Sequence, residues 1–450
     1  MNNLQLTNTL TNKKEIFNPI NSKKVSLYAC GPTVYDNPHV GNARAIVVFD
    51  LLFRILIELF GKNKVLYIRN ITDIDDKIIE ASKNKKISIN ELTKEITKKF
   101  HQDCKSLFCL KPTKEPKATE HVDGMIKMTE QLIYKKAAYQ IDGHVYFSVE
   151  SFKNYGKLSN KNLGDLKAGA RVEVSKKKKD PLDFVLWKPS DNNDPGWDSP
   201  WGRGRPGWHL ECSVMSEKYL GSNFDIHGGG IDLIFPHHEN EIAQSCVFNG
   251  TEKFANYWVH NGFVTIKKEK MSKSLGNITT IENATKKYSG QVVRLSLLSA
   301  QYKQPLDWSD TLLNEQSKVL DKWYTMYSTE MSDHTPECFK DLLDDMNTPL
   351  YISKLHDLFQ QSQNGDKNKK KEFNRACRLI GLFNETSEER VNFKKGKYQI
   401  SEKMILSKIH ERDQAKKNSN YKLADKIRAD LNKEGIDIKD EKGKTTWKYK

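Results

Sequence analysis

Residues 25–69, VSLYACGPTVYDNPHVGNARAIVVFDLLFRILIELFGKNKVLYIR, hold the pattern that decides the fold. The apolar segment 25–30 predicts a buried strand that ends at Gly31-Pro32, and residues 42–60 predict a long apolar helix that ends at Gly61. Residues 64–69 predict the next strand, and NITDIDDKIIEASK opens another helix. A strand, a helix, a strand and a helix at this spacing predict a parallel α/β unit.

This pattern is interrupted between about residues 120 and 205. DGHVYFSV predicts a hairpin strand, VSKKKKDP a charged loop, and SDNNDPGWDSPWGRGRPG a turn-rich return. The α/β pattern resumes at GWHLECSVMSEKYLG and FDIHGGGIDLIFPHHENEIAQ. We therefore expect one parallel sheet whose two halves are separated by an insertion.

Helical periodicity dominates after about residue 310. Ser309 fits the N-cap of an amphipathic helix whose apolar positions are Leu312, Leu313, Leu320 and Trp323. A second amphipathic helix, with Leu423, Ile427 and Leu431 on one face, is expected to stop at Gly435. The C-terminal third of the chain is therefore predicted to be mainly helical.

The composition bounds the class of protein. A chain of 450 residues predicts about three domains, and 37% hydrophobic residues exclude wholesale disorder. The net charge of +15 suits a polyanionic partner, although a lysine-rich solvated surface explains it equally well. The N-terminus has no signal-peptide core, no apolar run has the length of a membrane span, and the seven cysteines are scattered. We expect a soluble cytoplasmic protein whose cysteines are reduced thiols.

The segment FPHHENEIAQ, residues 235–244, packs two histidines and two glutamates together. On a helix, His237 and Glu241 share a face, and His238 with Glu241 is an alternative pair that the spacing does not exclude. Zinc prefers four ligands, so others must come from elsewhere. Cys30 and Cys212 are good candidates because both lie at the ends of segments assigned to the sheet. The alternative is that both cysteines are ordinary core residues.

Two further segments favour phosphate binding. PHVGNAR, residues 38–44, places His39 and Gly41 where backbone N–H groups at a helix N-terminus bind phosphate. EKMSKSLGN, residues 269–277, forms a cationic loop in which Lys270 and Lys273 are able to stabilise a triphosphate. Taken singly, each segment is also explained by an ordinary turn or a solvated loop.

Together these segments resemble a known family. HVGN at residues 39–42 and KMSKS at 270–274 are similar to the two signature motifs of class I aminoacyl-tRNA synthetases. YACGPTVYDNPHVGNAR, GRPGWHLECSVM, FDIHGGGIDLIFPHHENEIAQ, HNGFV and EKMSKSLGN resemble, more narrowly, the cysteinyl-tRNA synthetase family. The resemblance continues through LDDMNTPL and YKLADKIRADLNKEGIDIKD, so that it spans essentially the whole chain.

The resemblance implies a catalytic zinc ion, one per chain, with the ligands Cys30, Cys212, His237 and Glu241. It thereby favours His237 over His238. The implied substrate-binding residues are Cys30, Thr72, Trp208 and His237, with Trp208 as the floor of the amino-acid pocket. Since a steric pocket separates cysteine from serine poorly, we expect the zinc to take the substrate thiolate and so reject serine. The remaining cysteines, 104, 109, 246, 338 and 377, are expected to be structural thiols.

The resemblance also implies that ATP, with Mg²⁺, is a substrate. Its binding residues are expected to be His39, Gly41, Asn42, Gly229, Asp232, Lys270 and Lys273, of which His39, Asn42, Lys270 and Lys273 act in catalysis. Asn42 departs from the family, which often has a histidine there, but its amide is still able to donate to the nucleotide. Cysteine would be activated as an adenylate and then transferred to the 3′-terminal adenosine of cysteine tRNA.

The implied organisation is a Rossmann-like catalytic domain in two halves, 1–120 and 206–250, separated by a connective-peptide insertion, 121–205. A stem-contact region with the KMSKS loop (251–310), a helical bundle (311–400) and a small anticodon-binding region (401–450) follow. The expected partners are L-cysteine, ATP and cysteine tRNA, with no membrane and a monomeric state. Two alternatives stay open: a paralogue that transfers activated cysteine to an amino sugar, and a non-catalytic RNA-binding protein with a structural zinc.

Overall fold

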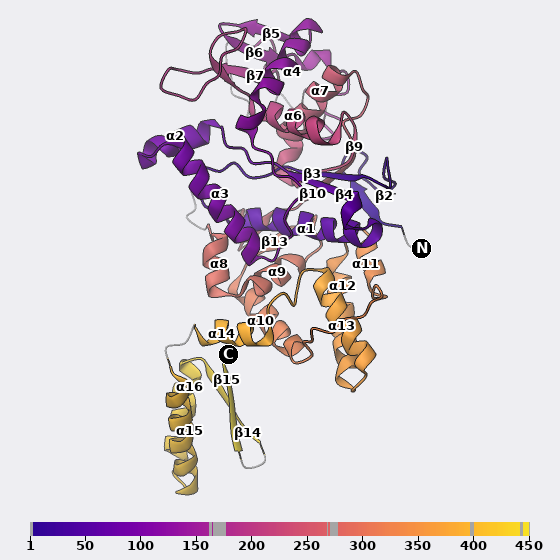
Figure 1. Cartoon of the computed structure of the whole chain (residues 1–450). Helices are drawn as coiled ribbons and strands as arrows, with labels where there is room; N and C mark the ends of the chain where they lie inside the picture. Colours follow the sequence, from indigo (N-terminus) through magenta and orange to yellow (C-terminus); the bar gives the residue numbers. More distant parts are fainter. Residues whose placement is uncertain are drawn as a thin grey trace. The chain divides into compact units, whose positions relative to one another are not determined.

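A computed structural model describes residues 3–161, 164, 177–267, 269–270, 278–396, 400–441 and 444–449 (Figure 1). The chain forms two compact units, Met1–Leu382 and Phe383–Lys450. Each unit is described by itself. Among the described residues, no helix combines the length and the apolar character that crossing a bilayer requires.

A parallel sheet organises the first unit. Its strand order is β10 (Ala255–Asn261), β9 (Phe224–Gly230), β3 (Val25–Ala29) and β4 (Val65–Arg69), and every neighbouring pair is parallel. The long helix α1 (Val40–Phe60) lies along this sheet and contacts all four strands (Figure 1). The predicted Rossmann-like parallel sheet is therefore confirmed, and the carboxyl ends of its strands meet at one edge.

Helix α1 begins two residues earlier than the sequence predicts. The ring of His39 caps the helix, because its Nδ1 accepts hydrogen bonds from the backbone N–H groups of Gly41 and Asn42 at 3.1 and 3.3 Å. Histidine is not a usual N-cap residue, so the apolar pattern alone placed the start at Asn42. The helix ends at Gly61, as predicted, where φ is 91°.

Buried charges fix α1 against α9 (Gly290–Leu298). Arg294 of α9 donates a hydrogen bond to Asp50 of α1, and both side chains are almost fully buried. Arg44 of α1 donates to the carbonyl oxygens of Ala300 and Gln301 at 3.3 and 3.0 Å, just beyond the end of α9. These contacts hold the first turn of α1 in a fixed place.

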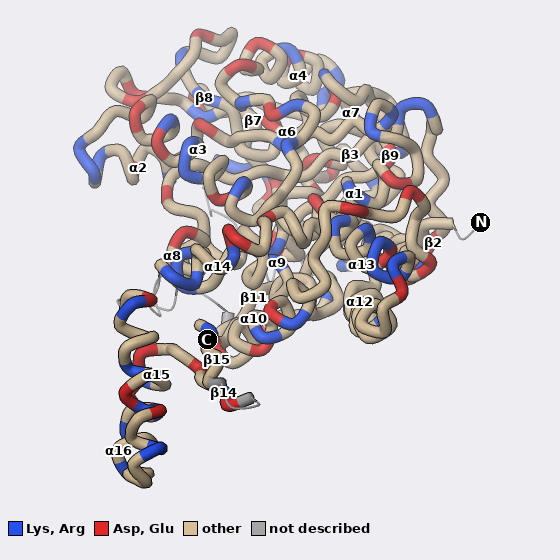
Figure 2. The backbone as a smooth tube through the Cα atoms, turned by 60° about the horizontal axis from the view of Figure 1, so that its bottom comes forward, with Lys and Arg blue, Asp and Glu red and all other residues tan. Residues whose placement is uncertain are grey.

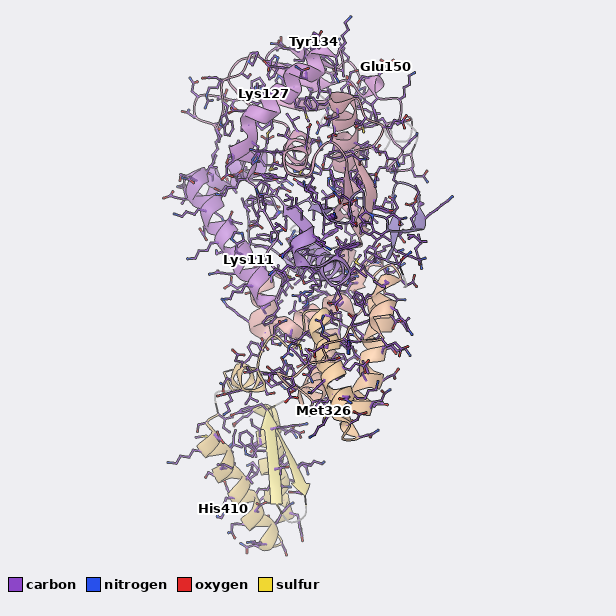
Figure 3. All side chains as sticks on the ribbon, turned by 45° about the vertical axis from the view of Figure 1, so that its right-hand side comes forward. Lys111, Lys127, Tyr134, Glu150, Met326 and His410 are labelled. Atoms are coloured by element: carbon purple, nitrogen blue, oxygen red, sulfur yellow. The ribbon has the colours of Figure 1, made fainter. Side chains whose placement is uncertain are left out.

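An antiparallel sheet lies in the sequence between β4 and β9 of the parallel sheet. Its strands are β5 (Ala138–Ile141), β6 (His144–Phe147), β7 (Phe184–Pro189) and β8 (Gly204–Pro206), in that order. Helix α4 (Val122–Tyr134) precedes it, while α6 (Trp208–Leu220) and α7 (Glu239–Asn249) follow and pack against each other. In Figure 3, Lys127 and Tyr134 mark α4 near the top of the view.

The first unit also contains a short N-terminal hairpin, β1 (Gln5–Asn8) with β2 (Lys13–Ile16), and a small sheet of three short strands, β11 (Val264–Ile266), β12 (Glu269–Lys270) and β13 (Leu306–Asp307). Two helices follow β4: α2 (Asp76–Lys85) and α3 (Ile89–Ser106). Further helices are α8 (Ile281–Lys287), α10 (Asp310–Tyr324), α11 (Phe339–Leu343), α12 (Thr348–Gln363) and α13 (Lys367–Leu379). Ser309 caps α10, as predicted, by accepting a hydrogen bond from the N–H of Leu312.

The second unit is small and mixed. It contains α14 (Ser387–Lys395), α15 (Glu402–Lys417), α16 (Tyr421–Lys433) and the hairpin β14 (Ile436–Glu441) with β15 (Lys444–Tyr449). Its core is built mainly from isoleucines of α15, α16 and β14. The predicted helix through Ile427 ends at Lys433, and Gly435 follows with φ 79°.

Candidate active site

Four side chains from three separate segments meet at the carboxyl edge of the parallel sheet. Cys30 directly follows β3, Cys212 lies on α6, and His237 and Glu241 come from the turn after β9 and from α7. Each side chain has its place because a strand end or a helix face turns it toward the same point. Cys212, His237 and Glu241 are at most 1% exposed.

The separations of the four ligand atoms fit a tetrahedral metal ion. Ligands held 2.0–2.3 Å from zinc at tetrahedral angles lie about 3.3–3.8 Å apart. Cys30 Sγ lies 3.7 Å from Cys212 Sγ, 3.6 Å from His237 Nε2 and 3.7 Å from Glu241 Oε1. His237 Nε2 and Glu241 Oε1, at 2.9 Å, are closer than this range. All four atoms lie within 4.8 Å of one another, so two thiols, an imidazole and a carboxylate form a donor set that zinc accepts.

A second set of ligands overlaps the first among the described residues: Cys30, His227, His238 and Glu241. His238 Nε2 lies 3.3 Å from Cys30 Sγ but 4.0 Å from Glu241, and its Nδ1 is 2.8 Å from His260 Nε2. His227 Nε2 is 2.8 Å from the outer oxygen of Glu241. Because only the first set contains both thiols, its donors match a zinc site better.

The charges of the cluster favour a cation. The hydrogen bond from Cys30 lowers the pKa of the Cys212 thiol to about 6, so that Cys212 is largely a thiolate near neutral pH. Burial alone would raise the pKa of Glu241, but His227 and His237 outweigh it and hold this pKa at about 2. Burial alone would lower the pKa of His237, but Glu241 and then Cys212 outweigh it and raise this pKa to about 10.

A second layer of side chains orients His237. Its Nδ1 lies 2.9 Å from Nδ1 of His209, while the indole of Trp208 stacks on the same ring with centroids 4.0 Å apart. Burial and the neighbouring His237 lower the pKa of His209 well below its usual value, so this ring stays neutral. Glu239, by contrast, turns away from the cluster and accepts hydrogen bonds from the N–H groups of Gly156 and Ser159.

The residues expected to bind ATP form a second group, at the N-terminus of α1 and the end of β9. His39 and Asn42 cap each other, because Asn42 Oδ1 accepts from the N–H of His39 at 3.0 Å. Backbone hydrogen bonds from Val40 to Thr279 and from Ile281 to Pro38 join this turn to the segment before α8. The first signature segment is thus joined through its backbone to residues 279 and 281, which follow the second signature segment in the sequence.

The structure describes three of the four other residues expected to bind the nucleotide. Gly229 lies at the end of β9, where a Cβ atom would come within 2.9 Å of the His238 ring, and Asp232 is exposed in the short turn that follows. The backbone of Lys270 pairs with Thr265 of β11. Lys273 lies outside the described residues.

Glu211 is a buried carboxyl residue beside the cluster that was not predicted from the sequence. This side chain is 1% exposed and accepts a hydrogen bond from the hydroxyl of Thr72 at 3.0 Å. Burial, and then the adjacent Cys212, raise its pKa well above the usual value. Thr72, expected to line the amino-acid pocket, is itself 1% exposed. In the sequence, the position of Glu211 directly before the predicted metal ligand Cys212 was the signal that could have marked it as a site residue.

Comparisons with known proteins agree with this geometry. A family model described as "tRNA synthetases class I (C) catalytic domain" matches residues 16–318. The chain is 55% identical over 447 residues to the cysteine–tRNA ligase of Pelagibacter ubique, covering 99% of both chains, and 50% identical over 460 residues to that of Rickettsia bellii, again covering 99% of both. These relatives favour neither of the two alternative functions.

Solved structures agree at the level of the fold. The Mycobacterium tuberculosis methionyl-tRNA synthetase in complex with methionyl-adenylate superposes with a TM-score of 0.57 at 13% identity, covering 80% of this chain and 89% of that one. At this identity the likeness concerns the fold alone. The family model and the full-length relatives go further: the chain belongs to the cysteinyl-tRNA synthetase family of class I aminoacyl-tRNA synthetases.

Proposed function

We propose that the chain is a cysteine–tRNA ligase, which activates L-cysteine with ATP, releases pyrophosphate and transfers cysteine to the 3′-terminal adenosine of cysteine tRNA. The observation that carries this proposal is the buried cluster of two thiols, one imidazole and one carboxylate in a chain of this family. Such a cluster offers what the reaction most needs, which is chemical selection of a sulfur atom.

Cys30, Cys212, His237 and Glu241 would hold a zinc ion. Bound zinc supplies a Lewis-acid centre that takes up the thiolate of cysteine far more readily than the hydroxyl of serine. The chain's own contribution is to fix the ligands, since His209 orients the ring of His237 and His227 holds Glu241. Trp208, stacked on His237, would form the apolar wall of the amino-acid pocket.

Adenylate formation would depend on positioning and on charge stabilisation rather than on a protein nucleophile. The cysteine carboxylate attacks the α-phosphate of Mg-bound ATP, and pyrophosphate leaves. The turn of His39, Gly41 and Asn42 would bind the phosphates, while Lys270 and Lys273 would neutralise the charge on the leaving group. Gly229 of β9 and Asp232 in the turn after it would bind the adenosine.

Transfer RNA would contact four segments of the chain. We assign 121–205 to the acceptor end as a connective peptide, 251–310 to the stem, 311–400 to a bundle before the anticodon and 401–450 to the anticodon. Lys and Arg recur along α15 and α16 of the C-terminal unit, which suits a phosphate backbone (Figure 2). His410 lies among them on α15 (Figure 3). We place the reaction in the cytoplasm, carried out by a monomer.

Cysteine-dependent exchange between ATP and labelled pyrophosphate tests the first step, and aminoacylation of a cysteine tRNA transcript tests the second. We expect both activities in zinc-loaded protein, and no exchange with serine. Absence of cysteine-dependent exchange would refute the proposal. Exchange without tRNA charging, together with turnover on an amino sugar, would instead support the paralogue.

A further inference from the structure

A cavity of about 230 Å³ adjoins the candidate metal cluster. Trp208, His209 and Glu211 of α6 form part of its wall, and Asp75 lies at the start of α2 on another side. Trp208 stacks on His237, so the cavity and the cluster share a wall. A molecule whose sulfur reaches the cluster would therefore extend its remaining atoms into or along this cavity.

Glu211 is the unusual group in this wall. Its side chain is buried, and the hydroxyl of Thr72 is its one hydrogen-bond partner among the described residues. Lys188 and Arg205 line the same cavity, but both side chains form ion pairs with Asp76. Buried carboxyl groups in proteins are normally paired with a cation, and Glu211 has no such ion pair with any residue that the structure describes.

A chain of hydrogen bonds holds Glu211 in this position. Asn70 Nδ2 donates to the hydroxyl of Thr72 at 3.2 Å, and the N–H of Gly31 donates to Asn70 Oδ1 at 2.9 Å. Because an amide NH₂ only donates, the single hydroxyl proton of Thr72 is directed at Glu211. This series of hydrogen bonds begins at Gly31, next to Cys30, and ends at Glu211, next to Cys212. It ties the carboxyl group rigidly to the two thiols and occupies only one of its two oxygens.

We propose that Glu211 binds the α-ammonium group of the substrate cysteine and so acts as a specificity-determining residue. This inference rests on the proposed function, because it takes the sulfur of the ligand to lie at the Cys30–Cys212 cluster. Recognition then has two points: the thiol at the cluster and the ammonium at the carboxylate one residue along α6. The ammonium supplies the missing counter-charge, and thiols without an amine are rejected.

Three thiols separate this role from a structural one. Cysteine has both an ammonium and a carboxylate, cysteamine lacks the carboxylate, and 3-mercaptopropionate lacks the ammonium. Their affinities are measured by isothermal titration calorimetry with zinc-loaded wild type and with Glu211→Gln, after the zinc content of each protein has been determined. We expect Glu211→Gln to bind cysteine and cysteamine roughly ten- to hundredfold more weakly, as expected for loss of a charge-assisted hydrogen bond, and to bind 3-mercaptopropionate as the wild type does.

Two further variants complete the experiment. Glu211→Asp keeps the charge and should retain the preference for the amine-bearing thiols, even if its affinities are lower. Glu217→Gln removes a carboxylate from the same helix and should bind all three thiols normally. An equal loss for all three thiols in Glu211→Gln, or no loss at all, would overturn the inference. If the wild-type protein shows cysteine-dependent exchange, either result would overturn only the role of Glu211, and the proposed function would stand.

Discussion

His209 is the best place to test how the cluster is built. If His237 binds the metal through Nε2, which faces Cys30 and Glu241, its ring proton must sit on Nδ1. That proton is then donated to His209 Nδ1 at 2.9 Å. His209 is able to accept it because burial keeps this ring neutral, with a pKa well below the usual value. Replacing His209 therefore removes the group that fixes both the orientation and the basicity of the ligand.

The magnitude follows from what is lost. His209→Ala leaves the buried N–H of His237 without an acceptor, which costs about 1–3 kcal/mol, and loss of a group that orients a ligand typically weakens metal binding by about 10–100-fold. We expect His209→Ala to fall in that range. His209→Asn places an amide oxygen near the former Nδ1 position and should recover most of the affinity.

A chelator of known zinc affinity, titrated against wild type and both variants, measures this effect directly. Circular dichroism serves as the control for folding. If His209→Ala holds zinc as tightly as the wild type, His237 is not oriented through this hydrogen bond. If the alanine and asparagine variants are equally weak, the loss comes from packing and not from the missing acceptor.

Three further outcomes are expected. Cys212→Ser should lose zinc and cysteine affinity together, because this buried thiol belongs to the metal set, and a variant with full metal content would contradict the assignment. Lys273→Ala should slow cysteine-dependent pyrophosphate exchange by about 100–1000-fold with cysteine affinity unchanged, and a normal exchange rate would disprove its role. Burial, and then Glu282, raise the pKa of Asp103 to about 7, so the folded state holds a proton that the unfolded state has released, and stability falls as the pH rises from about 4 to about 7. At pH 8 the free energy of unfolding of Asp103→Asn should therefore exceed that of the wild type by about 1–2 kcal/mol, a value reduced to allow for screening by water, and near pH 4 the two should be equal. Urea titrations at both pH values measure this difference. The same difference at both pH values would contradict the prediction.

The fold was largely predictable because its strongest signals are local. Five consecutive buried residues in β3 and a 21-residue apolar helix leave little choice of structure, and Gly61 and Gly435 mark helix ends by their positive φ. The start of α1 was missed by two residues because a histidine ring, rather than a hydroxyl or carboxylate, caps it. Local patterns carry no information about such a side-chain choice.

The site was predictable only in part, since its contacts join distant segments. Spacing alone left His237 and His238 equivalent, and the structure separates them through partners that no local pattern shows: His209 for one ring and His260 for the other. Glu211 was missed for the same reason, because its partner Thr72 lies 139 residues away along the chain. The residue types of a site can be recognised in a sequence, but the neighbours that tune them depend on the fold.

The distance along the chain between the ligands also has a consequence for the protein's own synthesis. Cys30 and His237 are 207 residues apart. At roughly 5–20 residues per second, the ribosome needs about 10–40 s to make the intervening chain. Because Cys212 follows Cys30 by 182 residues, the first thiol is without any of its partners for most of that time and is available to oxidants and to stray ions. On the proposed function, the full set of four zinc ligands would therefore exist only once α7 has been made, and a truncated product ending before α7 would lack Glu241.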